Sequence, residues 1–373
     1  MYREVLIAGA GPTGLAAALF LAERGIKSRI VDPNEQPSTT SKALGVNPRS
    51  LELLESSGVT GEILAQALKM VRMKLHQDGR PLGEVRVDPE AQGARFPFVI
   101  LPQSGTERLL TAALAKHGIK PERGLTLTWI DQDDGGVDYI LTDALGGELR
   151  GRAAILLGAD GAHSAVRHLL GVGFPGAALP EAWQIIDCTV AQPDPQPHGH
   201  IDFQREGPWV ALPYDKKTWR LIGPGPDLTK RLPPGWTLKK VVWRSDFHIS
   251  HRVADKLTVG RVCLAGDAAH IHSPLGARGM NLGIEDAYVF AACAADALAS
   301  DKSNRLADYG RIRREVDTAV VRRVELLTKA IRARGLIART IRKWLVPRVA
   351  RSLKAAAAFN RTATGLDHPV RLN

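Results

Sequence analysis

Apolar and flexible segments alternate at the start of the chain. Residues 5–8 (VLIA) form a short apolar run that predicts a buried strand. Residues 16–24 are rich in Ala and Leu, which predicts a helix that ends at Gly25. Residues 28–31 predict a second strand, with Asp32 at its end. This order of strand, helix and strand is typical of a β-α-β unit with two parallel strands.

Two later segments repeat the pattern of an apolar strand followed by glycines and a helix. The run from Ala153 predicts a buried strand that leads to Asp160 and a short helix. Residues 261–265 predict another strand, which ends beside Asp267, and a long helix is predicted from about Asn281. Ligands of open α/β sheets lie at the carboxyl edge of the strands, so both acids are well placed for a hydroxylated ligand.

The middle of the chain alternates with a period of two. Residues 181–221 predict the strands of a substrate-binding sheet. The pattern leaves open which face looks inward, and Tyr214 is either a polar contact there or an ordinary surface residue. One face carries His200, Asp202 and Gln204, and the other carries Ile201, Phe203 and Arg205.

Helical spacing returns in the C-terminal part. Residues 304–329 carry an apolar stripe, and Gly335 ends the predicted helix. A second apolar stripe between Ile337 and Leu353 is flanked by Arg and Lys, and Pro347 is expected to kink it. A basic amphipathic helix with a Trp can lie on an anionic membrane surface. Packing on the protein body, with the arginines in water, is the favoured alternative.

The positive charge of the chain is concentrated near its C-terminus. The 373 residues are 44% hydrophobic and 24% charged, which is typical of a globular protein of two or three domains. The net charge is +11, and residues 322–361 hold twelve basic residues against one acid, Glu325. The excess therefore belongs to this segment. Nucleic acid is a disfavoured partner because the basic stripe has few aromatic residues and no recognised module.

The remaining composition predicts a cytoplasmic location. The three cysteines are dispersed and odd in number, so they predict neither a disulfide framework nor a metal site. No apolar run is long enough to span a bilayer, and we expect no secretory signal because the first residues read as a strand. The cysteines are Cys188, Cys263 and Cys293.

Glycines at the first turn predict a dinucleotide site. Gly9, Gly11 and Gly14 have the G-x-G-x-x-G spacing, which permits a tight turn, close approach to a pyrophosphate and close helix–strand packing. The helix N-terminus then points free N–H groups at the anion. Asp32 lies where a carboxylate accepts hydrogen bonds from an adenosine ribose. The motif by itself does not distinguish FAD from NAD, and a glycine-rich turn without a ligand is the alternative.

Three motifs in this order carry a family resemblance. They are GAGPTG at residues 9–14, GADGAHSAVR at 158–167 and GDAAHIHSPLGARGMN at 266–281. With them the chain resembles the class A FAD-dependent aromatic hydroxylases, the flavoprotein monooxygenases of the para-hydroxybenzoate hydroxylase-like superfamily.

The resemblance implies an α/β fold with a Rossmann-like FAD/NAD(P)-binding domain, an inserted β-sheet substrate domain and a C-terminal helical segment. It implies that NAD(P)H binds as a co-substrate without a fold of its own, in agreement with the lack of a second G-x-G-x-x-G motif. The expected division is a FAD domain of residues 1–75, 98–175 and 255–300, a substrate domain of 76–97 and 176–254, and basic helices in 301–373.

The resemblance also implies which residues contact FAD. Lys42 stands where relatives often have Arg, and it supplies a charge to the pyrophosphate without the planar fork of an arginine. Arg49 is an alternative contact for that anion. The ADP half would be held by Gly9, Gly11, Pro12, Thr13, Gly14, Asp32 and Pro33, and the rest of the cofactor by Gln103, Asp160, Gly266, Asp267, Pro274, Gly279, Met280 and Asn281.

The expected reaction uses NAD(P)H and O2 to hydroxylate an aromatic or polycyclic small molecule through a flavin C4a-hydroperoxide. The flavin does the chemistry, so no catalytic side chain and no metal are expected. The substrate-side candidates are His272, Pro274, Arg278 and Tyr214, whereas His270 is expected to hold its loop in place.

Two other functions stay open from the sequence. One is a flavin-dependent oxidoreductase of the same fold that acts on a lipophilic quinone or isoprenoid without inserting oxygen. The other is a flavin-binding protein without turnover. The sequence leaves the oligomeric state and the choice between NADH and NADPH undetermined.

Overall fold

The first strand of the chain belongs to a central, mostly parallel sheet. The computed structural model of the protein describes residues 4–39, 43–191, 198–300 and 304–372. The sheet has the order β18-β19-β12-β1-β2-β8, and all pairs are parallel except β18 with β19. Its strands are β1 (Val5–Ala8), β2 (Ser28–Asp32), β8 (Glu122–Arg123), β12 (Ile155–Gly158), β18 (Thr258–Val259) and β19 (Val262–Leu264).

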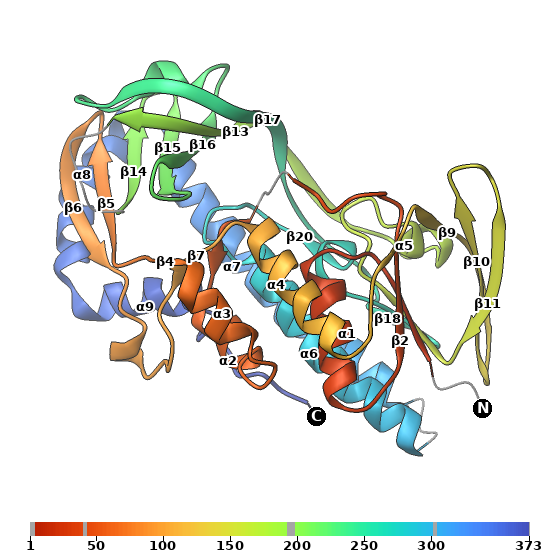
Figure 1. Ribbon diagram of the computed structural model, residues 1–373. Coiled ribbons are helices and arrows are strands. Elements are labelled where there is room, and N and C mark those ends of the chain that lie inside the picture. Colours follow the sequence, from red (N-terminus) through yellow and green to blue (C-terminus); the bar gives the residue numbers. More distant parts are fainter. Residues whose placement is uncertain (1–3, 40–42, 192–197, 301–303, 373) are drawn as a thin grey trace.

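Helices cover this sheet and bring its connections together. Figure 1 shows α1, α4 and α6 side by side in the middle of the molecule, and α1 contacts both of the others. Ala16, Ala17 and Ala18 in α1 are completely buried, so small side chains let the neighbouring elements approach closely. These helices and their neighbours are α1 (Pro12–Glu23), α2 (Pro48–Leu53), α3 (Val59–Gln66), α4 (Gln103–Lys116), α5 (Ala165–Leu169) and α6 (Gly279–Ser300).

An eight-stranded sheet lies at the other end of the molecule (Figure 1). Its order is β20-β17-β13-β16-β15-β14-β5-β6, and only β14 and β5 pair in parallel. The mixed α/β architecture expected from the sequence is thereby confirmed. The strands are β5 (Arg72–Gln77), β6 (Arg80–Arg86), β13 (Gly176–Ala191), β14 (Gly199–Gln204), β15 (Gly207–Pro213), β16 (Thr218–Pro224), β17 (Thr237–Val253) and β20 (His270–Ile271).

The two faces of this sheet have different partners. Ile201, Phe203 and Val210 share a buried cluster with Leu275, which lies in the loop after β20. Trp209 belongs to a separate cluster on the opposite face. The alternation read from the sequence is therefore correct. The face that carries Ile201 and Phe203 looks toward residues 272–278, the loop between β20 and α6, which we call the downstream loop.

Two small sheets complete the β structure of the described residues. One is an antiparallel meander of β9 (Leu125–Asp133), β10 (Gly136–Asp143) and β11 (Glu148–Ala153). The other joins β3 (Gly45–Val46), β7 (Val99–Ile100) and β4 (Leu68–Lys69). Three single turns of 3-10 helix are η1 (Glu90–Gln92), η2 (Leu228–Arg231) and η3 (Gly266–Ala268).

Three helices form the C-terminal part: α7 (Asn304–Arg332), α8 (Leu336–Arg351) and α9 (Leu353–Thr364). The stripe predicted for α7 is largely buried, with Leu306 and Tyr309 fully inaccessible. Pro347 lies inside α8. After α9 the chain runs back from the left side of the view, and the C-terminus lies at the lower rim of the molecule (Figure 1). Among the described residues, no helix combines the length and hydrophobicity needed to cross a membrane.

Candidate functional site

The loop after β1 is closely packed on one side and open on the other. A Cβ on Gly14 would lie 1.9 Å from the Gly9 carbonyl oxygen, and one on Gly9 would lie 2.2 Å from the Ala159 oxygen. A Cβ on Gly11 would meet no atom within 4 Å. Helix α1 begins directly after Gly11, at Pro12, so its first-turn amides have no partner within the helix. The loop therefore has room and hydrogen-bond donors for an anion.

Asp32 closes this loop from the end of β2. Its Oδ2 accepts a hydrogen bond from the Ala10 amide at 2.8 Å, and its Oδ1 accepts one from the Asn34 amide at 2.9 Å. Arg123 lies 3.6 Å from Oδ1. The neighbouring Pro33 is exposed. The carboxylate is thus fixed at the carboxyl edge of the central sheet, where the sequence placed it.

Thr13 joins the first glycine motif to the last one. A Cβ on Gly266 would lie 2.5 Å from Thr13 Oγ1, and one on Gly283 in α6 would lie 2.2 Å from the same atom. The Gly266 amide also donates to Asp286 Oδ2 in α6 at 2.9 Å. Segments more than 250 residues apart therefore form one site, and glycine is required at both positions, Gly266 and Gly283, that face Thr13.

Asp160 and Asp267 flank the first loop from two neighbouring strands. Asp160 lies beside Gly9 and accepts a hydrogen bond from the Val166 amide through Oδ2 at 3.1 Å. Its Oδ1 is buried without a hydrogen-bond partner among the described residues. Asp267 is exposed and lies in the 3-10 turn η3. Asp160 thus keeps one acceptor for a ligand at this edge.

Gln103 begins α4 and holds the segment that precedes β3. Its Oε1 accepts a hydrogen bond from the Ala43 amide at 3.3 Å, and its Nε2 donates to Glu107 at 2.8 Å. Lys42, the expected pyrophosphate contact, lies outside the described residues. Arg49, the alternative, donates to the backbone oxygens of Gly365 and His368 at 3.5 and 3.2 Å. Arg49 therefore binds the C-terminal segment.

The downstream loop passes through an unusual backbone conformation into α6. Gly276 and Ala277 have positive φ angles of 109° and 53°. The Pro274 oxygen accepts the Ala277 amide at 3.1 Å, which makes a tight turn. Gly279 is the first residue of α6, and Met280 packs in the main core. The helix N-terminus therefore follows directly on a strained turn.

His272 is neutral in this loop, and His270 is charged. Burial lowers the pKa of His272 to about 3, with the charges of His270 and Arg278 acting in the same direction. Its Nδ1 lies 2.9 Å from the Ser273 oxygen, so this nitrogen donates and Nε2 is an acceptor. Burial opposes the charge on His270, but Asp317 and Asp286 outweigh it and raise the pKa to about 9.

Arg278 does not have the neighbours that the sequence analysis expected. It was a candidate for the substrate side, but its side chain is completely buried and turns toward the C-terminal segment. Its Nη1 donates to the Thr362 oxygen at 3.1 Å. A guanidinium needs compensating acceptors when it is buried, and α9 and the residues after it provide them.

Tyr214 connects the eight-stranded sheet to the downstream loop. Its ring packs on a cluster that includes Phe98 and Ala277. Burial and the charge of Asp187 raise its pKa, and it hydrogen-bonds Ser104 in α4. The Arg220 guanidinium lies 5.0 Å from the centre of the ring. Tyr214 is thus the substrate-side candidate that the structure places between the sheet and the loop.

Arg220 and Asp187 form a buried ion pair that the sequence analysis did not identify. Both nitrogens of the fork, Nε and Nη2, lie 2.7 Å from the two Asp187 oxygens. Arg220 is inaccessible, and it shares the sheet face of Ile222 because the two alternate with Leu221. The signal available in the sequence was a charged residue within the apolar strand WRLI.

A second buried cluster joins β20, α6 and α7. Arg313 donates to Asp286 at 2.7 Å and to Asp317 at 3.0 Å, and His270 lies 2.7 Å from Asp286. His270, Asp286 and Asp317 offer three ligand atoms within 4.8 Å of one another. The Arg313 cation lies among them and compensates the two acids, so the cluster is an ion network. The spacing of Arg313 and Asp317 by four residues was its signal in the sequence.

These observations fit FAD. The open space at Gly11, the first-turn amides of α1 and the unpaired oxygen of Asp160 suit a pyrophosphate and its riboses. A Cβ on Gly279 would meet only His272 Cε1, at 3.9 Å, so the start of α6 also has room beside it. Thr13 brings both places together, as one extended dinucleotide requires.

Comparisons with known proteins agree with this assignment. Residues 2–324 match the family described as FAD binding domain. The 6-methylpretetramide 4-monooxygenase of Streptomyces rimosus is 32% identical over 82% of this chain and 58% of that protein. The chain spans about three fifths of the length of the curated relatives it matches.

Solved structures show the same fold. The anhydrotetracycline hydroxylase from Streptomyces rimosus superposes with a TM-score of 0.82 at 29% identity, over 100% of this chain and 77% of that chain. The p-nitrophenol 4-monooxygenase from Pseudomonas putida DLL-E4 has a TM-score of 0.89 at 21% identity, over 97% of this chain and 98% of that chain.

Proposed function

Because this chain belongs to the FAD-binding domain family and, within it, to the class A FAD-dependent aromatic hydroxylases, we propose that it is an FAD-dependent monooxygenase. The proposed reaction uses NAD(P)H and O2 to hydroxylate an aromatic or polycyclic small molecule. The observation that carries the proposal is the close packing of Thr13, in the first glycine motif, against Gly266 and Gly283, which brings a phosphate-binding loop and α6 into one site.

Different residues would bind different parts of the cofactor. In the proposal, the loop of Gly9, Gly11 and Gly14 binds the ADP half, and Asp267 binds the ribityl or pyrophosphate region. The N-terminus of α6 lies along the flavin ring, where its positive end and free amides stabilise negative charge. The chemistry supplied with bound FAD is acceptance of a hydride from NAD(P)H and activation of O2.

The sheet face that looks toward the downstream loop would orient the substrate. The cluster on this face is apolar, the Arg220–Asp187 pair is buried within the face, and Tyr214 adds a hydroxyl at its edge. An aromatic ring with a hydroxyl or carbonyl group suits such a surface, because apolar contact supplies affinity and few polar groups set the orientation. Relatives at 32% and 29% identity are named for 6-methylpretetramide and anhydrotetracycline, and these favour a polycyclic aromatic substrate.

We also propose the domain division expected from the sequence, with the substrate sheet inserted into the FAD domain. The order of the strands supports it, because β12 and β19 are neighbours in the central sheet while β13 to β17 lie between them in sequence. Separate expression of residues 176–254 and heteronuclear NMR would test whether that segment has an autonomous core.

Purified protein reconstituted with FAD tests the proposed function. We expect bound FAD, NAD(P)H oxidation stimulated by some members of a panel of phenols and polycyclic aromatics, and a product heavier by one oxygen atom. Stimulated oxidation with a product of unchanged oxygen content would favour the alternative, an oxidoreductase of quinones or isoprenoids. Protein that binds FAD but oxidises NAD(P)H with no member of either class would overturn both.

The outward face of α8 supports a further part of the proposal, contact with an anionic membrane surface. Leu336, Ile337 and Trp344 are 82%, 79% and 61% exposed, so the apolar stripe of this helix faces away from the body. The helix contains no acid, and Lys343 and Arg348 are exposed beside the stripe. This combination suits a surface that offers hydrocarbon together with negative charge.

Co-sedimentation with vesicles tests this contact. We expect binding to vesicles that contain phosphatidylserine, weaker binding in high salt, and loss of binding when Ile337 and Trp344 are both changed to Ser. Binding that is absent at low salt would overturn the proposal, as would a concentration-dependent dimer in ultracentrifugation that the same double variant abolishes. The three buried, unpaired cysteines favour a reducing cytoplasmic compartment, which fractionation of cells would test.

A further inference from the structure

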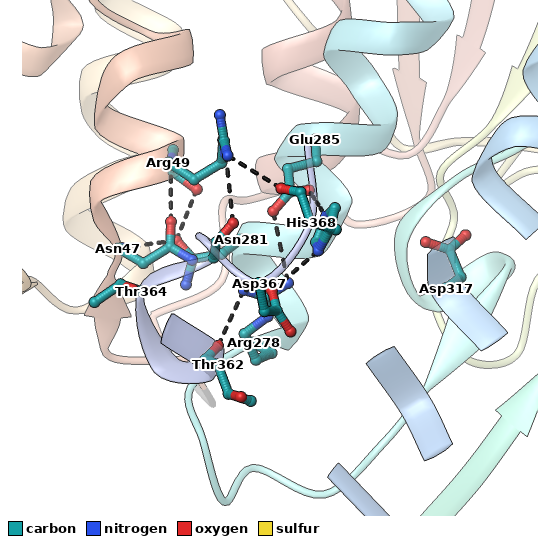
Figure 2. A network of polar contacts seen from close by, with 12 residues as sticks. Asn47, Arg49, Arg278, Asn281, Glu285, Asp317, Thr362, Thr364, Asp367 and His368 are labelled. Carbon is teal, nitrogen blue, oxygen red and sulfur yellow. Dashed lines mark hydrogen bonds and ion pairs between the residues drawn. The ribbon is translucent and has the colours of Figure 1, made fainter. Parts of the chain in front are cut away.

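The C-terminal segment returns to the loop that precedes α6. Figure 2 shows Thr362, Asp367 and His368 around Arg278, with Glu285 of α6 on the other side. The chain reaches this place only after α7, α8 and α9. Val370 and Leu372 then pack against the main hydrophobic core, and Arg305 donates to the Leu372 oxygen at 2.7 Å. The segment is therefore attached on both sides of Arg278.

Arg278 is the centre of these contacts. Its guanidinium donates to the Thr362 oxygen at 3.1 Å and lies 3.4 Å from Asp367 Oδ1 and 3.8 Å from Glu285 Oε1. The side chain is completely buried. A buried cation needs acceptors with fixed positions. Two of the three partners come from the C-terminal segment, so the place of Arg278 depends on that segment.

Gly365 shows how closely the segment approaches. It has a φ of 79°, and a Cβ there would lie 2.8 Å from Asn47 Nδ2, 2.9 Å from Arg49 Cβ and 3.0 Å from Arg278 Nη1. Arg49 adds its hydrogen bond to the His368 oxygen at 3.2 Å. The left-handed turn thus lets the backbone enter a space that a larger residue would fill.

His368 ties the same segment to α6. Its Nε2 lies 2.7 Å from Glu285 Oε2, and its Nδ1 lies 3.0 Å from Asp367 Oδ1. Arg323 of α7 pairs with the second Asp367 oxygen. Glu285 stands six residues after Gly279, the start of α6. The segment therefore contacts the loop at Arg278 and the helix at Glu285.

The loop needs such support because of its backbone. Ala277, directly before Arg278, has a φ of 53°, a conformation that a residue with a Cβ adopts only when its surroundings hold it. Gly276 before it has a φ of 109°. Asn281 fixes the far end of the turn through a bond from Nδ2 to the Ala277 oxygen at 2.7 Å. Arg278 is the side chain that fixes the middle.

We propose that residues 362–372 form a C-terminal strap that holds residues 273–281 in place against the flavin end of FAD, with Arg278 as the positioning residue. The inference rests on the proposed function, since it takes the start of α6 as the flavin end of the site. The strap acts on one end of the cofactor only. The ADP end is bound by the Gly9–Gly14 loop, whereas hydrogen bonds and ion pairs of the strap run to Arg49, Arg278 and Glu285.

Comparing FAD with ADP separates this role from a general loss of stability. The apoprotein is titrated with each ligand by calorimetry, for the wild type, for Arg278→Met and for a chain that ends at Thr364. We expect both changes to weaken FAD binding by about tenfold or more and to leave ADP binding within about twofold, a difference of about 1 kcal/mol or more. The absorption spectrum of bound FAD should also lose its resolved visible band, because the ring becomes more exposed to water.

Matched variants complete the test. Arg311→Met removes an exposed arginine of α7 that pairs with Asp308, and it should change the affinity for neither FAD nor ADP. The double variant of Asp367→Asn and Arg278→Met should lose less FAD affinity than the sum of the two single losses, because the two side chains act as a pair. If Arg278→Met gives no folded apoprotein, Arg278→Lys and the truncated chain carry the test.

The outcomes are distinguishable from a failure of the proposed function. Equal losses of FAD and ADP affinity in the strap variants, or no loss of either, would overturn the strap and leave the monooxygenase proposal intact. Tight FAD binding that weakens as expected, in a protein that never oxidises NAD(P)H, would support the strap and overturn the proposed reaction.

Discussion

The side-chain oxygen of Asn281 lies 3.0 Å from the backbone nitrogen of Asn47, 234 residues earlier in the chain. The same oxygen accepts from the Ser50 hydroxyl at 2.8 Å. The amide nitrogen of Asn281 donates to the oxygens of Gly45 at 2.9 Å and Ala277 at 2.7 Å. One buried side chain thus uses its whole hydrogen-bonding capacity to join the start of α6, the downstream loop and the segment before α2.

Replacing Asn281 by Leu should lower the free energy of unfolding by about 3 kcal/mol, because several buried polar groups lose their partner at once. Urea denaturation of the apoprotein measures the change. Gln66→Leu, which replaces an exposed amide at the end of α3, should stay within about 0.5 kcal/mol of the wild type. Equal effects of both substitutions would contradict the role given to Asn281.

Gly11→Ala should remove FAD binding without unfolding the protein. The residue has an ordinary φ of −80°, and the added methyl group meets no protein atom within 4 Å, so it fills only the space given to the pyrophosphate. We expect FAD affinity to fall more than about tenfold, while stability changes by less than about 1 kcal/mol. Fluorescence titration with FAD and thermal denaturation of the apoprotein measure the two quantities.

Gly61→Ala is the matched control for this change. Gly61 lies in α3, is exposed, and also has no atom within 4 Å of an added Cβ. It should raise stability by up to about 1 kcal/mol and leave FAD affinity unchanged. Gly14→Ala should instead unfold the loop, because its Cβ would lie 1.9 Å from the Gly9 oxygen. Normal FAD binding by Gly11→Ala would refute the placement of the pyrophosphate.

His270 should stabilise the protein in a pH-dependent way. Its pKa is raised from 6.5 to about 9, because Asp317 and Asp286 outweigh the effect of burial. The folded state therefore binds a proton that the unfolded chain releases above its own pKa. The contribution of His270 is full below pH 6.5 and is lost as pH rises through about 9. The stability difference between wild type and His270→Gln should shrink over that window in urea denaturation.

His272 should have the opposite effect on the pH dependence of stability. Its pKa is lowered to about 3 by burial, so the folded state resists a proton that the unfolded chain binds below pH 6.5. The wild type therefore loses stability between pH 6.5 and about 3 on account of this residue. His272→Gln should become more stable relative to wild type as pH falls through that window. Parallel pH profiles for the two variants would be incompatible with the assigned charges.

Arg220 and Asp187 should behave as a unit. Arg220→Met leaves a buried carboxylate unpaired and should cost about 3–5 kcal/mol of stability, whereas Arg220→Met combined with Asp187→Leu should recover most of the loss. If the pair orients the substrate, the double variant folds and binds FAD, but an aromatic substrate no longer stimulates its NAD(P)H oxidation. Unchanged stimulation in the stable double variant would exclude the pair from the substrate side.

Several parts of the fold followed from local sequence. The strand–glycine–helix–strand order at residues 5–32 was predictable because a short apolar run, a tight glycine turn and an Ala/Leu-rich helix are each specified by neighbouring residues. Helix α7 was predictable for the same reason, since its apolar stripe repeats over about six turns. The boundaries were less certain: α1 begins at Pro12, four residues before the predicted start, because proline is favoured in the first turn of a helix.

Only the tertiary structure shows which face of the eight-stranded sheet points toward the downstream loop. Alternation separated Ile201 and Phe203 from His200 and Asp202, but both sets are buried, so burial did not distinguish the two faces. The contact of the first set with Leu275 decides the matter. That contact depends on how β17 leads into β20 and the loop after it, which no local pattern encodes.

The sequence by itself determined the chemistry of the site: three glycine motifs, their acids and the family that carries them. The partners of these residues were decided only by the folded chain. Arg278, expected near a substrate, is held by Asp367 and Thr362, and Asp286 closes the Gly266 turn while it pairs with Arg313. Glycine spacing acts through the backbone of adjacent residues, so local sequence reveals it. A buried charge pairs with residues that the fold brings close to it, and for Arg278 these are Thr362 and Asp367 of the C-terminal segment.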